Sequence, residues 1–344
     1  MSGGIDSSVA ATLLKKEGFE VVGAFMKLAN LPNFKEGQKR AEKIAKILKT
    51  PLLVFDLEKE FKKRIIDYFL KEYKAGNTPN PCVLCNKEIK FGLMLEKAMK
   101  LGIDLIATGH YAIIKGVKKF KLLRAKDKRK DQSYFLWMLN QEQLKRIVFP
   151  IGNYTREEVK NLARKFKLPV LRAKKSVEIC FIEKTVSDFL KKYLKEKPGK
   201  IVDTKGKVLG EHDGLWFYTI GQRKGIGLSG GPWWVIEKDV NKNMLVVTKN
   251  ENDLLKKELF CKDVNWISGK EPKLPLKVKA KIRYKTDFAK AIIYSKFSHL
   301  RKRANIKNKI YKAVFEKPQR AITPGQSVVF YKGEEVLGGG IICN

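Results

Sequence analysis

Near its start the sequence carries a glycine- and serine-rich stretch, SGGIDSS at residues 2–8, whose residue types suit phosphate binding. Gly3 and Gly4 would let successive backbone N–H groups converge on an anion, and a helix expected over residues 7–16 would add partial positive charge at its amino end. The stretch lacks the lysine of a Walker loop and the three spaced glycines of a dinucleotide-binding fingerprint. A serine-capped glycine turn explains a bare SGG, whereas the full string before a helix favours another kind of nucleotide loop.

The segment GNTPNPCVLCNKEIKFG at residues 76–92 carries the first of two candidate cysteine sites. Its prolines predict a turn, after which Cys82 and Cys85 precede a helix expected from about Asn86. A thiol just before the amino end of a helix has its thiolate stabilised by the helix dipole. The pattern therefore predicts a nucleophilic thiol.

The second cysteine site is KKSVEICFIEK at residues 174–184, where Cys180 follows Glu178 in a stretch with three lysines. Positive surroundings favour the thiolate here as well. The remaining cysteines, Cys261 and Cys343, are expected to be small apolar core residues.

Length, composition and charge set wider limits. A chain of 344 residues is long enough for two or three domains. It has neither a run of about 18 apolar residues nor a secretory signal, so a cytoplasmic protein without a membrane segment is expected. Five cysteines in such a chain argue against a disulfide framework. The formal net charge of +36 fits a polyanionic partner, although the lysine-rich composition of an AT-rich genome would produce the same charge.

The elements that must hold these residues alternate between helix and strand in the first third of the chain. Hydrophobic periodicity predicts helices over residues 7–16 and 36–48 and strands over residues 19–26, 52–56 and 103–108. This alternation is typical of a parallel sheet covered by helices.

From about residue 195 onward, glycine-rich turns separate short alternating runs, with one short helix expected near residues 253–257. Such runs are typical of small β domains and barrels. We therefore predict an α/β nucleotide-binding catalytic domain over residues 1–194, a small β domain over residues 195–256 and a tRNA-binding β-barrel over residues 257–344, the tRNA role being implied by the resemblance that follows.

Together these strings resemble the PP-loop superfamily of ATP pyrophosphatases and, within it, the tRNA-specific 2-thiouridylases, over almost the whole chain. The further strings that carry the resemblance are FMK at 25–27, NTPNPCVLCNKEIKFG at 77–92, ATGHYA at 107–112, KDQSYFL at 130–136, FPIGNYTREEVK at 149–160, EICFI at 178–182 and YTIGQRKGIG at 218–227. The resemblance implies a Rossmann-like first domain of the adenine nucleotide alpha hydrolase type. It also implies a strand directly before residue 2, upstream of Met1.

The resemblance implies ATP-dependent 2-thiolation of the wobble uridine, position 34, of tRNA. ATP with Mg²⁺ would adenylate the uridine 2-oxygen and release pyrophosphate. The residues implied to bind ATP are Ser2, Gly3, Gly4, Ile5, Asp6, Ser7, Met26 and Gly109.

The same resemblance implies that the cysteines transfer the sulfur. Cys180 would carry a persulfide, charged by a separate donor such as a cysteine desulfurase or a sulfur-relay protein. Cys85 would be the nucleophile that releases this sulfur and would end in a Cys85–Cys180 disulfide, while AMP departs with the original oxygen.

Recognition of tRNA is also implied by the resemblance. The residues implied to contact the target base are Asn80, Pro81 and Cys82, and those implied to contact the rest of the tRNA are His110, Lys130, Asp131, Gln132, Arg283, Tyr284 and Gln326. For His110, a hydrogen-bonded core histidine is an equally good interpretation of the sequence.

One position departs from the family pattern, because Cys82 stands where the family form has an aspartate. With Cys85 and Cys180 it resembles the three-cysteine arrangement of PP-loop tRNA thiolases that bind a 4Fe-4S cluster, so a cluster route stays open beside the persulfide route. The sequence also leaves open a PP-loop amine ligase such as a tRNA lysidine synthetase, which needs no paired cysteines, and a non-catalytic tRNA-binding protein.

Overall fold

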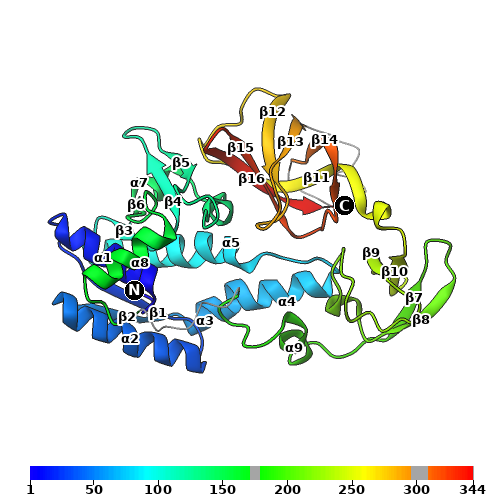
Figure 1. The fold of residues 1–344 in the computed structure, drawn as a ribbon, viewed down its shortest axis with the longest axis horizontal. Coiled ribbons are helices and arrows are strands. Elements are labelled where there is room, and N and C mark those ends of the chain that lie inside the picture. The colour runs from blue at the N-terminus through cyan, green and yellow to red at the C-terminus, as the bar shows by residue number, and fades with distance from the viewer. Residues whose placement is uncertain (171–178, 296–308, 344) are drawn as a thin grey trace.

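The structure is a computed structural model that describes residues 1–170, 179–295 and 309–343. An α/β part built from the first half of the chain lies beside two β parts, and helices α4 and α5 extend from it toward them (Figure 1). The expected fold class, an α/β part followed by two small β domains of which the last is a barrel, is confirmed. Lys174, Lys175 and Glu178, which the sequence places near Cys180, lie outside the described residues.

The parallel part of the fold consists of two short sheets. Strand β1 (Gly23–Lys27) pairs in parallel with β2 (Leu52–Asp56), and β3 (Ile106–Ala107) pairs in parallel with β6 (Ile147–Val148). The parallel sheet expected from the sequence is thus divided in two within the described ranges. The strand implied before residue 2 stays a prediction.

The helices of this part begin earlier than the periodicity indicates. Helix α1 spans Ile5–Lys16, and α2 spans Pro32–Leu48. Helix α2 can begin at Pro32 because the first N–H groups of a helix have no partner within it, so the N–H that proline lacks is not missed there. Helix α1 packs against α8 (Arg156–Lys165), and α2 packs against β1 and β2. Both helices contribute to one apolar cluster, through Val9 and Ile44 among others.

Two helical rods follow, which the sequence analysis predicted only in part. The first joins α3 (Glu58–Phe61), the π-helical segment η1 (Lys62–Ile66) and α4 (Asp67–Lys74). The second joins α5 (Pro81–Cys85), the π-helical segment η2 (Asn86–Leu93) and α6 (Met94–Lys100). The prediction of a helix start near Asn86 is wrong, because Pro81 occupies the first helical position and the helix therefore begins before both cysteines.

The C-terminal part is a closed antiparallel barrel that also pairs with the α/β part. Its strands are β11 (Leu255–Trp266), β12 (Leu276–Lys281), β13 (Ala289–Ser295), β14 (Tyr311–Arg320), β15 (Ser327–Lys332) and β16 (Glu335–Cys343), in the order β11–β14–β13–β12–β15–β16, and β16 pairs back to β11. The hairpin of β4 (Ala112–Lys115) and β5 (Lys121–Arg124) extends this sheet, since Leu123 pairs with Glu335. This pairing across the two parts was not predicted.

The central β part has one mixed sheet in the order β8–β7–β10–β9, in which β7 and β10 are parallel and the outer pairs are antiparallel. Its strands are β7 (Gly199–Val202), β8 (Val208–His212), β9 (Trp234–Asp239) and β10 (Met244–Thr248). The short helix expected near residues 253–257 is a 3-10 turn, η5 (Glu251–Leu254). The remaining short helices are η3 (Ser133–Leu136), α7 (Gln141–Lys145), α9 (Val186–Lys191) and η4 (Leu215–Phe217).

The α/β part and the barrel share a core in which buried polar groups are paired. The indole N–H of the fully buried Trp137 donates to the hydroxyl of Ser327 at 3.0 Å, and the Tyr134 hydroxyl donates to the Ser327 carbonyl oxygen at 2.9 Å. The side-chain amide of Asn265 donates to the carbonyl oxygens of Trp137 and Leu139 at 2.7 and 2.9 Å. Because an unpaired buried polar group is costly, these bonds fix how the two parts meet.

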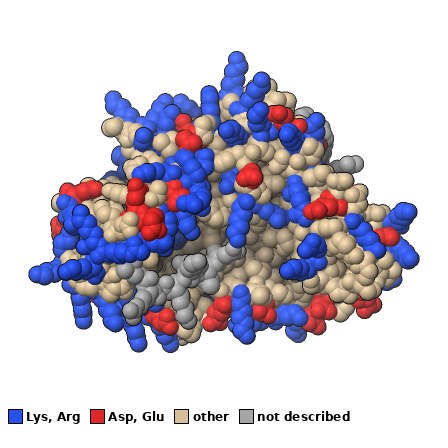
Figure 2. Space-filling view, viewed as in Figure 1, with Lys and Arg blue, Asp and Glu red and all other residues tan. Residues whose placement is uncertain are grey.

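Lysine and arginine side chains are spread over the outside of the molecule. On the face shown in Figure 2 they lie over every part of the fold, with acidic side chains scattered among them. Within the ranges that the structure covers, no helix combines the length and the apolar character that crossing a bilayer requires. A polyanion would therefore meet a broadly basic surface on this face.

Ser327→Ala tests the shared core. The substitution leaves the buried Trp137 N–H without an acceptor, so we expect the free energy of unfolding in urea to fall by about 1–3 kcal/mol. Ser268→Ala, at an exposed loop position, is the control and should stay within about 0.5 kcal/mol of the parent. Equal effects of the two substitutions would contradict the assignment.

Candidate active site

The loop at residues 2–8 is organised by its own serines. The Ser2 and Ser7 hydroxyls lie 3.1 Å apart, and the Ser7 and Ser8 hydroxyls donate to the Gly4 carbonyl oxygen at 3.1 and 2.8 Å. Gly4 is the N-cap of α1 and, as a glycine, has no side chain with which to cap the first turn. The amino end of α1 can therefore offer its backbone N–H groups to an anion.

Two glycines let other elements approach this loop closely. Gly3 has a φ of +71°, and a Cβ there would lie 2.5 Å from the carbonyl oxygen of Gly37 in α2. A Cβ at Gly109 would lie 2.7 Å from the backbone nitrogen of Ser7. Gly109 therefore borders the loop directly, while Met26, in β1, packs against the apolar cluster that contains Cys85.

The carboxylate of Asp6 belongs to a polar cluster that the sequence analysis missed. The Tyr111 hydroxyl donates to Asp6 at 2.8 Å, and the Arg156 guanidinium forms an ion pair with the same carboxylate. The backbone N–H of Arg156, in turn, donates to Asp127 at 3.0 Å. Tyr111 and Arg156 both lie inside strings that carry the family resemblance, and this location is the one feature of the sequence that could have marked them as site residues.

The turn that precedes Cys82 is held by a loop of the barrel. The Thr78 N–H donates to the Pro324 carbonyl oxygen at 2.9 Å, and the Gln326 side-chain amide donates to the Thr78 carbonyl oxygen at 2.7 Å. Gly325, with a φ of +89°, lies so near that a Cβ would be 2.9 Å from the Thr78 nitrogen. The turn is thus fixed by residues from the far end of the chain.

The three residues implied to contact the target base begin the second rod. Asn80 is the N-cap of α5, Pro81 is its first residue and Cys82 follows in the first turn. Asn80 also lines a cavity of about 60 Å³ against the barrel, which holds roughly two water molecules. A flipped base therefore needs more room than this cavity offers.

Apolar neighbours bring Cys180 to the other two cysteines. The ring of the buried Phe181 packs edge-on against Phe61 and Phe69, with ring centroids 5.7 and 5.5 Å apart. Cys85 belongs to the same apolar cluster as Phe181. None of the three cysteines forms a disulfide with a described residue, and they lie close enough that charges on Cys82 and Cys85 raise the pKa of Cys180.

Helix α2 connects this thiol cluster, defined as Cys82, Cys85 and Cys180, to the phosphate loop. The Asn33 side-chain amide donates to the Cys180 carbonyl oxygen at 2.9 Å. One helical turn later, about 6 Å along the axis, Gly37 meets Gly3 of the loop. The two predicted sites therefore lie against the same end of one helix.

Burial dominates the acidity of the thiols. Desolvation raises the pKa of Cys85 to about 11 and that of Cys180 to about 12, and it also raises the pKa of Cys82. Lys90 lowers the pKa of each of the three thiols, but by less than burial raises it. For Cys82 and Cys85 the expectation of a thiolate activated by a helix end is therefore wrong for the free protein, because desolvation outweighs nearby charge. For Cys180 the expectation of positive surroundings stays a prediction, because Lys174 and Lys175 lie outside the described residues.

His110 has the environment of a core histidine. It is 9% exposed, its Nδ1 lies 2.7 Å from the Thr108 hydroxyl, and its ring packs against Phe91 and Phe149. Burial holds the pKa of His110 well below its usual range, and Lys90 lowers it further. The imidazole is therefore neutral at physiological pH.

Asp131 and Gln132, which are implied to contact tRNA, have internal partners. The Asp131 carboxylate accepts from the Arg124 guanidinium at 3.0 Å and from the Ser133 N–H at 3.1 Å. The Gln132 side-chain oxygen accepts from the Tyr111 N–H at 2.9 Å. These contacts position the segment that ends the β4–β5 hairpin.

The barrel residues in the same set are also engaged. The Arg283 guanidinium donates to the carbonyl oxygens of Ile220 and Ala321, each at 3.0 Å, and so joins the central part to the barrel. The Tyr284 ring lies 4.5 Å from that of Phe135, between centroids. Lys130, by contrast, is exposed.

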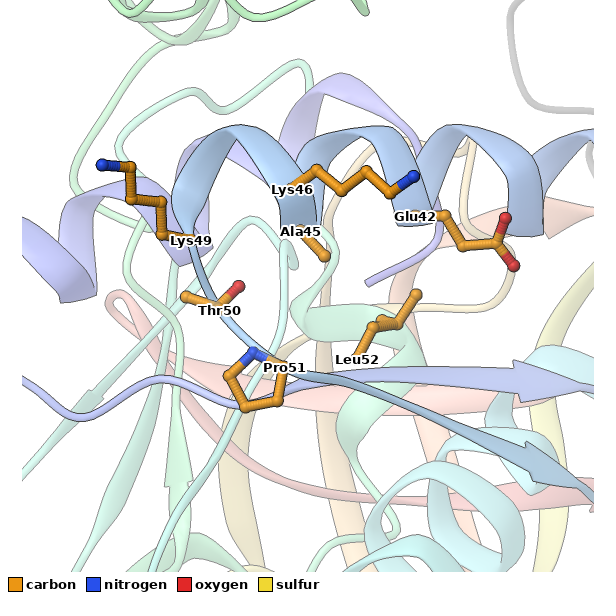
Figure 3. A pocket seen from close by; sticks show the side chains of 7 residues that line it. All are labelled: Glu42, Ala45, Lys46, Lys49, Thr50, Pro51 and Leu52. Carbon is orange, nitrogen blue, oxygen red and sulfur yellow. The ribbon is translucent and has the colours of Figure 1, made fainter.

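A second cavity, of about 350 Å³, lies between the end of α2 and the start of β2 (Figure 3). Its lining residues are Glu42, Ala45, Lys46, Lys49, Thr50, Pro51 and Leu52, none of which was predicted as a site residue. Across the described segments, no group of three or more His, Cys, Asp or Glu side chains is arranged to hold a metal ion. The 4Fe-4S hypothesis therefore gains no support from the placement of the cysteines.

Comparison with known proteins identifies the family of this chain. Residues 1–184 match the tRNA methyl transferase HUP domain, residues 187–249 the tRNA methyl transferase PRC-barrel domain and residues 256–342 the aminomethyltransferase beta-barrel domain. The tRNA-specific 2-thiouridylase MnmA of Syntrophomonas wolfei is 44% identical over 346 residues, which cover 99% of this chain and 98% of that protein. MnmA 2 of Thermoanaerobacter sp. is 46% identical over 363 residues, covering 99% and 96%. The chain belongs to the tRNA-specific 2-thiouridylase family.

Membership of the tRNA-specific 2-thiouridylase family confirms the resemblance found in the sequence. It places the chain among enzymes whose relatives are named for the thiolation of uridine in tRNA. The roles of the individual residues named above stay predictions.

The raised thiol pKa values predict slow alkylation of Cys180 although the residue is exposed. Because its pKa of about 12 lies above the whole range, the iodoacetamide rate at Cys180 should rise about tenfold per pH unit from about pH 7 to about pH 10. Mass spectrometry of the Cys180 peptide measures this rate, and free cysteine, which levels off above its pKa of about 8.5, is the control. A plateau in the alkylation rate of Cys180 below about pH 9 would show that desolvation does not dominate the pKa of this thiol.

Proposed function

We propose that this protein uses ATP to replace the 2-oxygen of the wobble uridine of tRNA with sulfur. The observation that carries the proposal is that Cys85 and Cys180 lie close to each other and that one end of α2 contacts both Cys180 and the glycine-rich loop. Relatives of 44% and 46% identity are named as tRNA-specific 2-thiouridylases. An RNA carbonyl needs activation of its oxygen and a sulfur nucleophile, and these two sites would supply them.

In the first step the loop binds ATP. Backbone N–H groups from Gly3 to Ser7, at the amino end of α1, would hold the phosphates, with Ser2, Gly4, Ile5 and Asp6 in the same loop and with Met26 and Gly109 bordering the nucleoside. When bound, Mg²⁺ neutralises the phosphate charge. The uridine 2-oxygen then attacks the α-phosphate, and pyrophosphate leaves.

In the second step sulfur replaces the adenylated oxygen. A donor that carries a persulfide first transfers its outer sulfur to Cys180. The Cys85 thiolate then attacks the inner sulfur of this persulfide, the bond to the outer sulfur breaks, and the outer sulfur keeps the electron pair and bonds to uridine C2. AMP leaves with the original oxygen. The two cysteines end oxidised as a disulfide, which a thiol reductant must reopen.

The tRNA would be bound mainly through phosphates and shape by the basic surface. We propose residues 1–194 as the catalytic domain, and residues 195–256 and 257–344 as β domains that position the tRNA. Exposed Lys130 can contact phosphate as it stands, whereas Arg283 and Gln326 would have to exchange internal hydrogen bonds for tRNA contacts. For Arg283 and Gln326, an equally specific role is to hold the site in place through these internal hydrogen bonds.

The chemistry of the thiol cluster favours thiolation over amine ligation, methyl transfer and simple tRNA binding. A lysidine synthetase or a methyl transferase, the activity named in two of the matched domain descriptions, needs no pair of cysteines beside the nucleotide loop. A non-catalytic tRNA-binding protein needs no intact phosphate loop.

Nucleoside mass spectrometry tests the proposal. Unmodified tRNA incubated with the protein, ATP, Mg²⁺ and a persulfide-generating cysteine desulfurase should gain 2-thiouridine at position 34. Cys85→Ser and Cys180→Ser should reduce this product below detection, because each removes one sulfur of the exchange. Cys343→Ser, in the barrel, is the matched control and should retain activity within about twofold. Full activity of both active-site variants would refute the thiol route.

The iron content of anaerobically purified protein separates the persulfide route from the cluster route. We expect iron far below one atom per chain, with thiolation unchanged by chelation. Stoichiometric iron whose removal abolishes thiolation would establish the cluster route instead.

A further inference from the structure

One cationic side chain outside the predicted site faces the thiol cluster. Lys90 is half-buried and lies in η2 (Asn86–Leu93), five residues after Cys85. In an α-helix, side chains five residues apart point about 140° away from each other, since each turn takes 3.6 residues. The π-helical segment, which closes hydrogen bonds between residues five apart, brings such side chains toward the same face. The local helix geometry therefore turns Lys90 toward Cys85.

The electrostatic contacts of Lys90 agree with this geometry. The charge of Lys90 acts on the thiols of Cys82, Cys85 and Cys180 and on the ring of His110. Among the residues that the structure describes, Lys90 is the one cation with a resolved effect on these thiols, and the other ionisable groups that affect them are the thiols themselves. Lys90 is thus close enough to the thiol cluster and to His110, the neighbour of Gly109, for its charge to act on both.

The ammonium group of Lys90 is not neutralised by its own helix. Glu88 is engaged elsewhere, by Arg64 at 3.3 Å and by Lys87 at 3.5 Å. Within the ranges that the structure covers, no carboxylate forms an ion pair with Lys90. A half-buried cation in this position is available to an anion that forms beside it.

We propose that Lys90 is the counter-ion for the sulfur anions of the transfer step. The inference rests on the proposed function and adds a residue to it. Two anions occur in that step: the Cys85 thiolate before it attacks, and the outer sulfur of the Cys180 persulfide as its bond to the inner sulfur breaks. The ammonium group of Lys90 stabilises both, while the uridine C2 takes the outer sulfur and AMP carries the oxygen away. Burial makes these anions costly, so a fixed cation has a large effect on them.

The test compares Lys90→Met with Lys90→Arg by alkylation of Cys180 in the full-length protein. Loss of a nearby positive charge raises a thiol pKa by about one unit or more, so Lys90→Met should lower the iodoacetamide rate at Cys180 about tenfold at a fixed pH near 9. Lys90→Arg keeps the charge and should retain the parent rate within about threefold. Lys87→Met, on the exposed side of the same helix, is the matched control and should leave the rate unchanged.

This readout needs neither tRNA nor ATP, so it stays interpretable even if the protein proves not to thiolate uridine. Under the proposed function, Lys90→Met should also raise the apparent pKa in the pH profile of single-turnover sulfur transfer by about one unit, while the rate of ATP–pyrophosphate exchange stays unchanged. Circular dichroism spectra of Lys90→Met and Lys90→Gln verify the fold. A Cys180 rate in a folded Lys90→Met or Lys90→Gln variant within about twofold of the parent overturns the proposal, as does an equal loss in Lys90→Arg.

Discussion

The contact between the turn at residues 77–80 and the barrel loop at residues 324–326 is the constraint on which the site depends. Thr78 and Gln326, 248 residues apart in sequence, share a 2.7 Å hydrogen bond, and Gly325 approaches the turn more closely than any residue with a Cβ could. The turn leads directly into the helix that carries Cys82, Cys85 and Lys90. The position of the thiols is therefore set by the C-terminal domain as well as by the domain that contains them.

Burial brings the cysteines of the thiol cluster together and also makes their ionisation costly. Packing around Phe181 brings Cys180 to Cys85, but desolvation raises the pKa of both thiols. A buried nucleophile needs compensating charge when it ionises. In the proposed mechanism Lys90 would supply one such charge from the helix that carries Cys85, and the basic surface would attract a polyanionic substrate.

Local sequence patterns predicted the elements that depend on local interactions. Strand β2 has the predicted bounds, and α1 differs only by two residues at its amino end, since apolar periodicity decides both. The helix at residues 58–74 was missed, and the helix start at Pro81 was placed too late because proline was interpreted only as a turn former, although it also suits the first helical position.

The contacts that depend on distant residues could not be predicted. Nothing in the β4–β5 segment indicates that Leu123 pairs with Glu335, and no spacing reveals that Arg156 meets Asp6. The acidity of Cys82 and Cys85 was misjudged for the same reason: charge can be counted along a sequence, whereas desolvation depends on what packs around the group. The motifs identified the participants, and tertiary packing determined their environment.

The central claim is that Cys85 and Cys180 exchange one sulfur atom while the RNA oxygen leaves. Its most direct test is a single turnover without reductant, using protein that carries one persulfide, followed by acid quenching and peptide mass spectrometry. The account predicts a Cys85–Cys180 disulfide that forms with the same rate constant as 2-thiouridine, in equal amount, and only when both ATP and tRNA are present. Accumulation of 2-thiouridine while Cys85 remains a free thiol would contradict it.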